Sequence, residues 1–99
     1  MAIRKRARKR AQFHPTSGPK WALGKVLRES RLEKGLSQEA LAEAAGLDRS
    51  FVSLLERGIQ SPNVVILFKI AGVLEVPASD LIAKTETIMQ GGLNRGSGS

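Results

Sequence analysis

The 99-residue chain contains no cysteine and only one histidine, His14. Without cysteine there is no disulfide framework, no cysteine-ligated zinc or iron–sulfur centre and no cysteine nucleophile. One histidine cannot build a metal site alone, so no cofactor is expected. No apolar run approaches the ~20 residues of a membrane-spanning helix, and no apolar stretch follows the basic start as in a secretory signal peptide. These absences favour a soluble intracellular protein that does not contact a membrane.

Residues that carry out catalysis are also scarce. The sequence has no Gly-rich phosphate loop, no Ser/His/Asp set and no carboxylate pair in an evident cleft. An enzyme is therefore not expected, and a binding function is favoured.

Acidic residues are missing from residues 1–15, where six Lys and Arg occur. The whole chain has a net charge of +7, and its other ten basic residues face nine acidic ones. A block of like charge stays solvated and usually binds an anionic polymer, most often nucleic acid. A solvating tail or a fused tag is the alternative. We therefore expect residues 1–19 to form a flexible basic arm that contacts DNA through Arg4, Arg6 and Arg8.

Hydrophobic periodicity predicts an all-α domain of five short helices and no strand. The helices are expected to be separated by glycine stops and to begin at the N-cap residues Ser37, Asp48 and Asn63. They are predicted at residues 20–34, 38–45, 49–57, 64–74 and 77–83. The domain would then cover residues 20–84, followed by a flexible tail at 85–99 whose closing Gly-Ser repeat is either native or an added linker. The alternative for residues 85–90 is that they extend the fifth helix.

The 20 residues 38–57 have the pattern of a helix-turn-helix. Gly46 falls in the turn, where a positive φ suits glycine, and Ala42 falls where the two helices approach closely. The apolar positions that would share one small core are Leu41, Ala45, Leu47, Val52 and Leu55. This combination favours a DNA-binding helix-turn-helix over a plain helical hairpin.

Three runs of sequence carry a family resemblance: LGKVLRESR at 23–31, GLSQEALA at 35–42 and LERG at 55–58. They resemble the Cro/cI-type (XRE, lambda-repressor-like) helix-turn-helix family over about residues 22–82. The resemblance implies a five-helix DNA-binding domain with the helix-turn-helix at its second and third helices. It also implies a dimer on DNA whose third helix, residues 49–57, lies in the major groove.

The resemblance further implies roles for polar residues of this motif. Gln38 would contact a phosphate and brace the recognition helix, Arg49 and Ser50 would face base edges, and Ser53 would lie near the phosphates. Leu54 departs from the family pattern, because it occupies an exposed base-facing position where a polar residue is usual.

Two more features follow from the same resemblance. Gln60, Ser61 and Asn63 would form the loop that approaches the DNA backbone. Arg31 and Glu56 would form a structural ion pair that ties the first helix to the end of the third.

Some roles stay open at the level of sequence. Arg49 either binds guanine, which is favoured, or contacts only phosphate, and Ser50 either reads a base or only begins the helix. One apolar set either covers the edge of the core or forms a dimer contact. This set comprises Ile59, Val65, Ile66 and Val73.

The sequence thus favours a sequence-specific transcriptional regulator, a cytoplasmic, nucleoid-associated repressor that binds double-stranded DNA as a homodimer. An antitoxin that binds a toxin protein and represses its own operon is the alternative. A non-specific nucleic-acid binder led by the arm is the third hypothesis.

Overall fold

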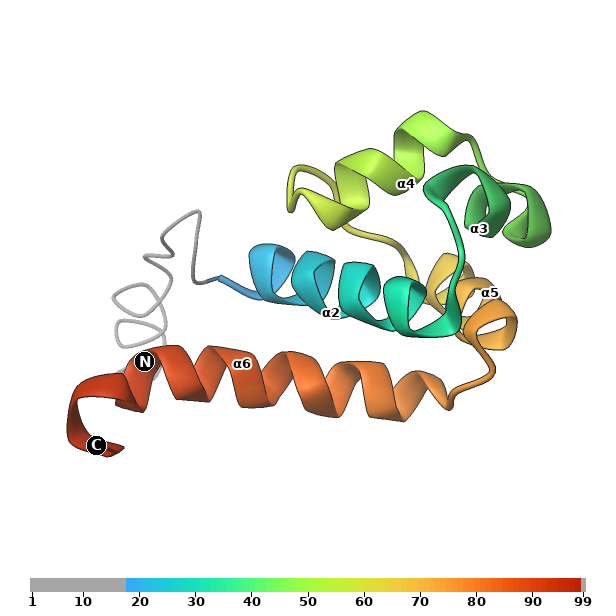
Figure 1. Cartoon of the computed structure of the whole chain (residues 1–99). Coiled ribbons are helices and arrows are strands. Elements are labelled where there is room, and N and C mark those ends of the chain that lie inside the picture. The colour runs from blue at the N-terminus through green and yellow to red at the C-terminus, as the bar shows by residue number, and fades with distance from the viewer. Residues whose placement is uncertain (1–17, 99) are drawn as a thin grey trace, which may run out of the picture.

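The computed structural model describes residues 18–98, with side chains described for residues 18–91. Arg4, Arg6 and Arg8 therefore lie outside the described residues. Within the described part the chain forms five helices and no strand, as the sequence predicted (Figure 1). The helices are α2 (Pro19–Lys34), α3 (Gln38–Ala45), α4 (Arg49–Glu56), α5 (Val64–Leu74) and α6 (Ala78–Gly98). None of them is long and apolar enough to cross a membrane.

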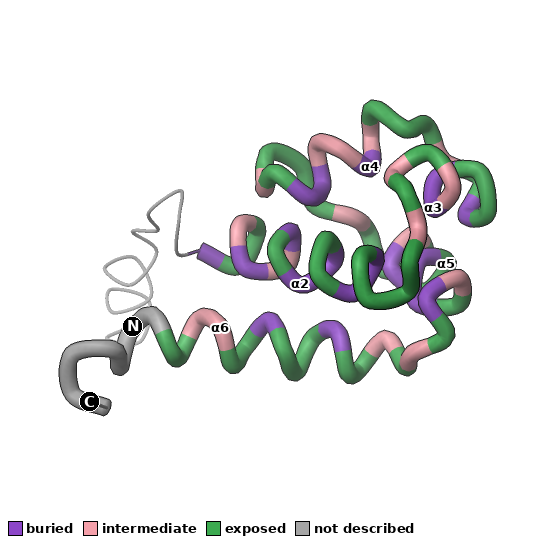
Figure 2. Tube along the Cα trace, in the orientation of Figure 1, coloured by how far each residue is buried: buried purple, intermediate pink, exposed green. Residues whose placement is uncertain are grey.

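All five helices meet in one core. Each contributes an apolar side chain that is at most 1% exposed, and α6 lies along α2 on the side away from α3 and α4 (Figure 1). The buried stretches of α6 recur along its edge toward α2 (Figure 2). The five side chains are Leu27, Leu41, Leu55, Ile70 and Leu81.

The helix starts confirm the three predicted N-cap positions, although only two side chains form cap hydrogen bonds. The Ser37 hydroxyl accepts from the Ala40 N–H at 3.0 Å, and the Asn63 Oδ1 accepts from the Ile66 N–H at 2.8 Å. Asp48 occupies the N-cap position of α4 with extended backbone, but its side chain forms no cap bond. The start of the recognition helix thus lacks the capping bond that helps begin the other two.

The last helix runs past its predicted end near Ala83, through the possible extension at 85–90 and beyond it. The backbone of α6 continues to Gly98, and therefore through the tail that was expected to be flexible. Thr85 is 6% exposed and Ile88 packs against the core, so the face that begins at Leu81 continues for two more turns. Packing of that face on α2 stabilises a helix that its own glycine-rich sequence does not favour.

A close backbone approach fixes α4 on α2. A Cβ atom at Gly24 would lie 2.4 Å from the carbonyl oxygen of Leu55 and 2.8 Å from that of Glu56. Real side-chain atoms do not come that close to a carbonyl oxygen, so glycine is required at this crossing. The C-terminal half of α4 therefore rests directly on the α2 backbone.

Candidate nucleic-acid interface

Helices α3 and α4 form the predicted helix-turn-helix. The turn bends at Gly46, where φ is +71°, and the Leu47 N–H donates to the Ala42 carbonyl at 2.8 Å. The inward faces of both helices are buried, and Leu47 packs against the core from the turn. The buried positions are Leu41, Ala42, Ala45, Val52 and Leu55.

A buried polar network fastens α4 to the two helices before it. Arg31 donates to the Glu56 carboxylate from Nε at 2.6 Å and from Nη2 at 2.9 Å, so the predicted ion pair is present. Gln38 Nε2 donates to Glu56 Oε1 at 3.0 Å, and Arg31 Nη1 donates to the Leu36 carbonyl at 2.8 Å. The hydrogen bond to Glu56 raises the pKa of Arg31 above its ordinary value. The guanidinium is therefore held in its charged form, which arginine keeps in proteins generally.

This network holds α4 in one orientation. Among the described side chains, no buried polar atom lacks a hydrogen-bond partner, so the desolvated charges are fully compensated. Gln38 thus braces α4 from the start of α3, as the family resemblance implied. The network lies on the inward side of α4 and leaves its other side free.

The outward side of α4 carries the residues predicted to face bases. Arg49 and Ser50 are exposed, whereas Ser53 and Leu54 are half-buried. Leu54 is therefore less exposed than the sequence suggested. The chain folds back over the end of α4, where the Leu54 carbonyl accepts from the Ile59 N–H at 2.9 Å. The first turn of α4 thus presents the cation of Arg49 and the hydroxyl of Ser50 to solvent, and Leu54 adds a partly exposed apolar side chain farther along.

The α4–α5 loop presents polar groups next to this face. Gln60 and Ser61 are exposed, as expected for residues that contact a DNA backbone. Asn63 is exposed too, but its side-chain oxygen is already bonded to the Ile66 N–H as a helix cap. The two N–H groups of the Asn63 side chain remain available to donate to an acceptor such as a phosphate oxygen.

The apolar set suggested as a dimer contact is divided by the structure. Ile59 is 50% exposed and Val65 62% exposed, whereas Ile66 and Val73 pack against the core. Sequence reasoning missed a larger exposed apolar group at Val64, Phe68 and Ile82, which lines a groove of about 690 Å³ between α5 and α6. The i,i+4 spacing of Val64 and Phe68, which flank the core residues Leu67 and Ala71 on α5, is the signal that could have revealed it.

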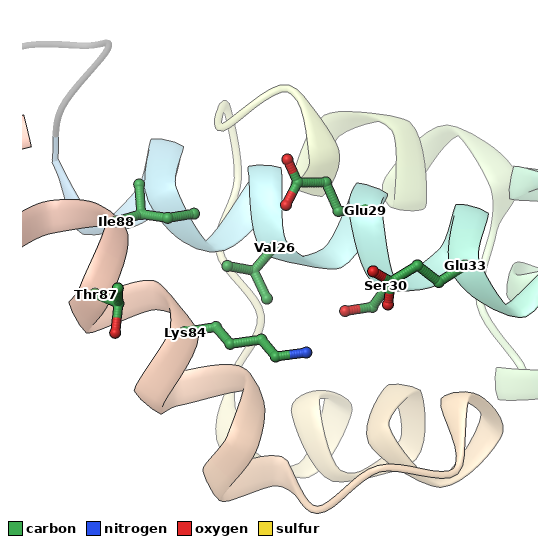
Figure 3. Close-up of a pocket in the computed structure, with 7 residues that line it drawn as sticks. All are labelled: Val26, Glu29, Ser30, Glu33, Lys84, Thr87 and Ile88. Carbon is green, nitrogen blue, oxygen red and sulfur yellow. The ribbon is translucent and has the colours of Figure 1, made fainter. Parts of the chain in front are cut away.

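A smaller hollow of about 240 Å³ lies between α2 and α6 (Figure 3). Val26 and Ile88 give it apolar walls, Glu29 and Glu33 lie on its α2 side, and Lys84 extends from α6 into the gap. None of its residues belongs to the predicted DNA-facing set. Among the described residues, no group of three His, Cys, Asp or Glu side chains is placed to hold a metal ion.

Comparison with known proteins agrees with this geometry. A helix-turn-helix family model matches residues 27–81, which include all of α3, α4 and α5. The chain belongs to this helix-turn-helix family. The resemblance to Cro/cI-type (XRE) proteins that was noted in the sequence is thereby confirmed.

Three relatives illustrate the likeness. The HTH-type transcriptional regulator SinR of Bacillus subtilis is 38% identical over 74 residues, which are 73% of this chain and 67% of SinR. A structure of SinR in complex with DNA matches 61% of this chain and 97% of that one, with a TM-score of 0.59. The restriction–modification controller C.AhdI of Aeromonas hydrophila is 44% identical, with a TM-score of 0.60, over 62% of this chain and 92% of the controller.

The structure of the third relative matches a larger share of this chain than the other two structures do. The clp gene regulator ClgR of Corynebacterium glutamicum is 27% identical, with a TM-score of 0.76, over 79% of this chain and 83% of ClgR.

Proposed function

We propose that this helix-turn-helix protein is a DNA-binding transcriptional regulator that places α4 in the major groove of double-stranded DNA. One observation carries the proposal: the Arg31–Glu56–Gln38 network holds α4 so that its exposed side begins with Arg49 and Ser50. The similar protein SinR is an HTH-type transcriptional regulator with a structure in complex with DNA. These relatives do not favour the antitoxin alternative.

Each residue of the proposed interface has chemistry that suits its position. The guanidinium of Arg49 has paired N–H donors that match the O6 and N7 acceptors of guanine. The hydroxyl of Ser50 can donate to or accept from a base edge. Leu54 offers only apolar contact, for which the thymine methyl is the partner in the major groove. Phosphate contacts are assigned to the remaining polar residues, which position the helix without reading sequence. They are Gln38, Ser53, Gln60, Ser61 and Asn63.

The basic arm would add affinity without specificity. Arg4, Arg6 and Arg8 are proposed to neutralise phosphates next to the site, or to enter a narrow minor groove there. Binding should therefore weaken steeply as salt rises. A protein of this kind acts where the DNA is, in the cytoplasm and on the nucleoid.

We further propose that the regulator acts as a homodimer through the α5–α6 groove. An eight-residue recognition helix reaches few base pairs, so one copy alone is a weak reader. Val64 and Phe68 are 66% and 63% exposed, which is unusual for apolar side chains that have no partner surface. Two copies that each place Phe68 in the other's groove would bury both patches. The dimer would act as a repressor by occupying a two-fold DNA site.

Selection of bound duplexes from a random DNA pool tests this function. The expected result is an enriched two-fold-symmetric sequence with half-sites about one helical turn, roughly 34 Å, apart. The selected duplex should bind at least ~10³-fold more tightly than a scrambled duplex of the same composition. Equal affinity for both duplexes would support the non-specific binder instead and would reject the proposal.

A further inference from the structure

A lysine from the beginning of the domain lies at the α4–α5 loop. Lys20 is in the first turn of α2, and its Nζ lies 3.5 Å from the carbonyl oxygen of Ile59, 39 residues later in the chain. The loop that starts at Ile59 continues with the exposed residues Gln60 and Ser61. The fold therefore brings an ammonium group to a loop that already presents polar side chains.

Backbone contacts fix the first turn of α2 at this loop. Gly58, at the end of the recognition helix, has φ of +75°, and a Cβ atom there would lie 2.9 Å from Trp21 Cα. The same atom would be 3.5 Å from the carbonyl oxygen of Lys20. Because backbone meets backbone here, Lys20 keeps its place relative to α4 and the loop.

The electrostatics of α2 do not explain a lysine at this position. A positive charge in the first turn opposes the helix dipole, and no acidic residue in that turn offsets it. In the part of the chain that the structure describes, the three ion pairs all involve other cations. The ammonium has the carbonyl of Ile59 as its recorded hydrogen-bond partner, which occupies one of its three donors.

The loop between α4 and α5, residues 57–63, has one cation of its own, the exposed Arg57 at its beginning. Residues 59–63 contain polar donors in Gln60, Ser61 and Asn63 but neither lysine nor arginine. From this stretch alone, a phosphate beside Ser61 would be held by neutral donors. Lys20 is the cation that the fold adds beside Ser61, and the two side chains line a surface recess of about 310 Å³ together with Pro19 and Leu23.

We propose that Lys20 and Ser61 bind one phosphate of the DNA backbone in this recess. The ammonium neutralises the phosphate charge while the Ser61 hydroxyl donates a further hydrogen bond. This contact rests on the proposed function, because it places the loop on DNA that α4 reads. It assigns a DNA-binding role to a residue on α2, outside the helix-turn-helix.

The experiment measures binding of the selected duplex, cut to about 30 base pairs so that two half-sites fit, as salt is varied. Lys20→Gln should lower the slope of log K against log salt by about 1 and weaken binding about 5- to 10-fold at 0.1 M salt. Lys20→Arg should keep the wild-type slope. Ser61→Ala should weaken binding with little change in slope, because a neutral donor releases no counterion. Lys84→Gln, which removes a charge on α6, is the matched control and should leave both quantities unchanged.

An unchanged slope in Lys20→Gln, with the wild type still specific for the selected duplex, overturns the Lys20 contact alone. An equal loss of slope in Lys84→Gln also overturns it, because the effect then comes from net charge. A wild-type protein that does not distinguish selected from scrambled duplex overturns the proposed function, and this contact with it. Melting curves report folding, and Lys20→Gln should melt no lower than the wild type because it removes a charge from the wrong end of α2.

Discussion

At the scale of single residues, Glu56 is the group on which the orientation of the recognition helix depends. Its carboxylate accepts from Arg31 on α2 and from Gln38 on α3, while its own backbone belongs to α4. The ion-paired side chains of Arg31 and Glu56 are 7% and 2% exposed, so neither charge is compensated by water. Removing one partner therefore leaves the other buried and uncompensated.

Glu56→Ala should lower the free energy of unfolding by about 3–5 kcal/mol, because it leaves the Arg31 charge alone in the core. The double variant Arg31→Met, Glu56→Leu should cost less, since it removes both charges and keeps apolar volume. Urea unfolding measures both variants. Glu29→Ala is the control: it breaks an exposed i,i+4 pair with Lys25 and should cost under ~1 kcal/mol. If the double variant proves less stable than Glu56→Ala, the charge argument is wrong.

Arg49 is the residue at which base reading can be tested. Arg49→Ala should weaken binding of the selected duplex by about 1–3 kcal/mol and relax specificity at one position per half-site. Repeating the selection with the variant measures the loss of preference. Leu54→Gln should instead shift the preference at a neighbouring position. Equal weakening across all sequences, in both variants, would mean that these residues only position α4.

At the scale of elements, the crossing of α2 and α4 decides where the recognition helix lies. The carbonyl groups of Leu55 and Glu56 lie against the Cα of Gly24, so there is no space for a side chain between the two helices. Any added atom there has to push α4 away from α2. Backbone oxygens cannot rotate away from an added methyl group as a flexible side chain could. This crossing therefore couples the stability of the domain to the placement of the exposed side of α4, which we propose to face DNA.

Gly24→Ala should destabilise the domain by about 1–3 kcal/mol or more, because the methyl group overpacks the crossing. It should also weaken DNA binding, since α4 has to shift. Gly91→Ala in α6 is the matched control, because its Cβ would meet nothing within 4 Å. The control should be neutral or stabilising by up to ~1 kcal/mol. Thermal melting and duplex titration of both variants decide it, and equal stability of the two would contradict the close approach.

At the scale of the whole molecule, two regions of the described surface differ in chemistry. The face with Arg49, Ser50, Gln60 and Ser61 is polar, whereas the α5–α6 face is apolar around Phe68. A polar face suits DNA, and an apolar groove of about 690 Å³ suits another protein surface. This division is the basis for assigning DNA binding to one face and self-association to the other.

Phe68→Glu should convert the dimer to a monomer and weaken binding to the two-fold site, because it places a charge in the proposed contact. Leu32→Glu on α2 is the control: Leu32 is 52% exposed but does not line the groove, so the dimer should persist. Sedimentation with and without DNA measures the oligomeric state. A wild-type monomer bound to a single half-site would exclude this dimer.

The sequence by itself determined the helix-turn-helix. Its glycine at the turn, its cap at Ser37 and its inward positions at Leu41 and Leu55 all depend on local spacing, as does the cap of α5 at Asn63. Arg31 and Glu56 were paired from the resemblance, and the structure confirms that pair. These features can be predicted from sequence because helix caps and hydrophobic periodicity involve residues only three or four positions apart.

Only the tertiary structure decided the features that depend on contacts between distant segments. The length of α6 depends on the burial of Thr85 and on the packing of Ile88 against the core. The glycine-rich sequence that follows does not predict a helix. The exposure of Phe68 depends on which side of α5 the core covers. The place of Lys20 at the α4–α5 loop depends on packing across 39 residues of sequence. Each of these is set by where whole helices pack, because burial and long-range contact are properties of the assembled core.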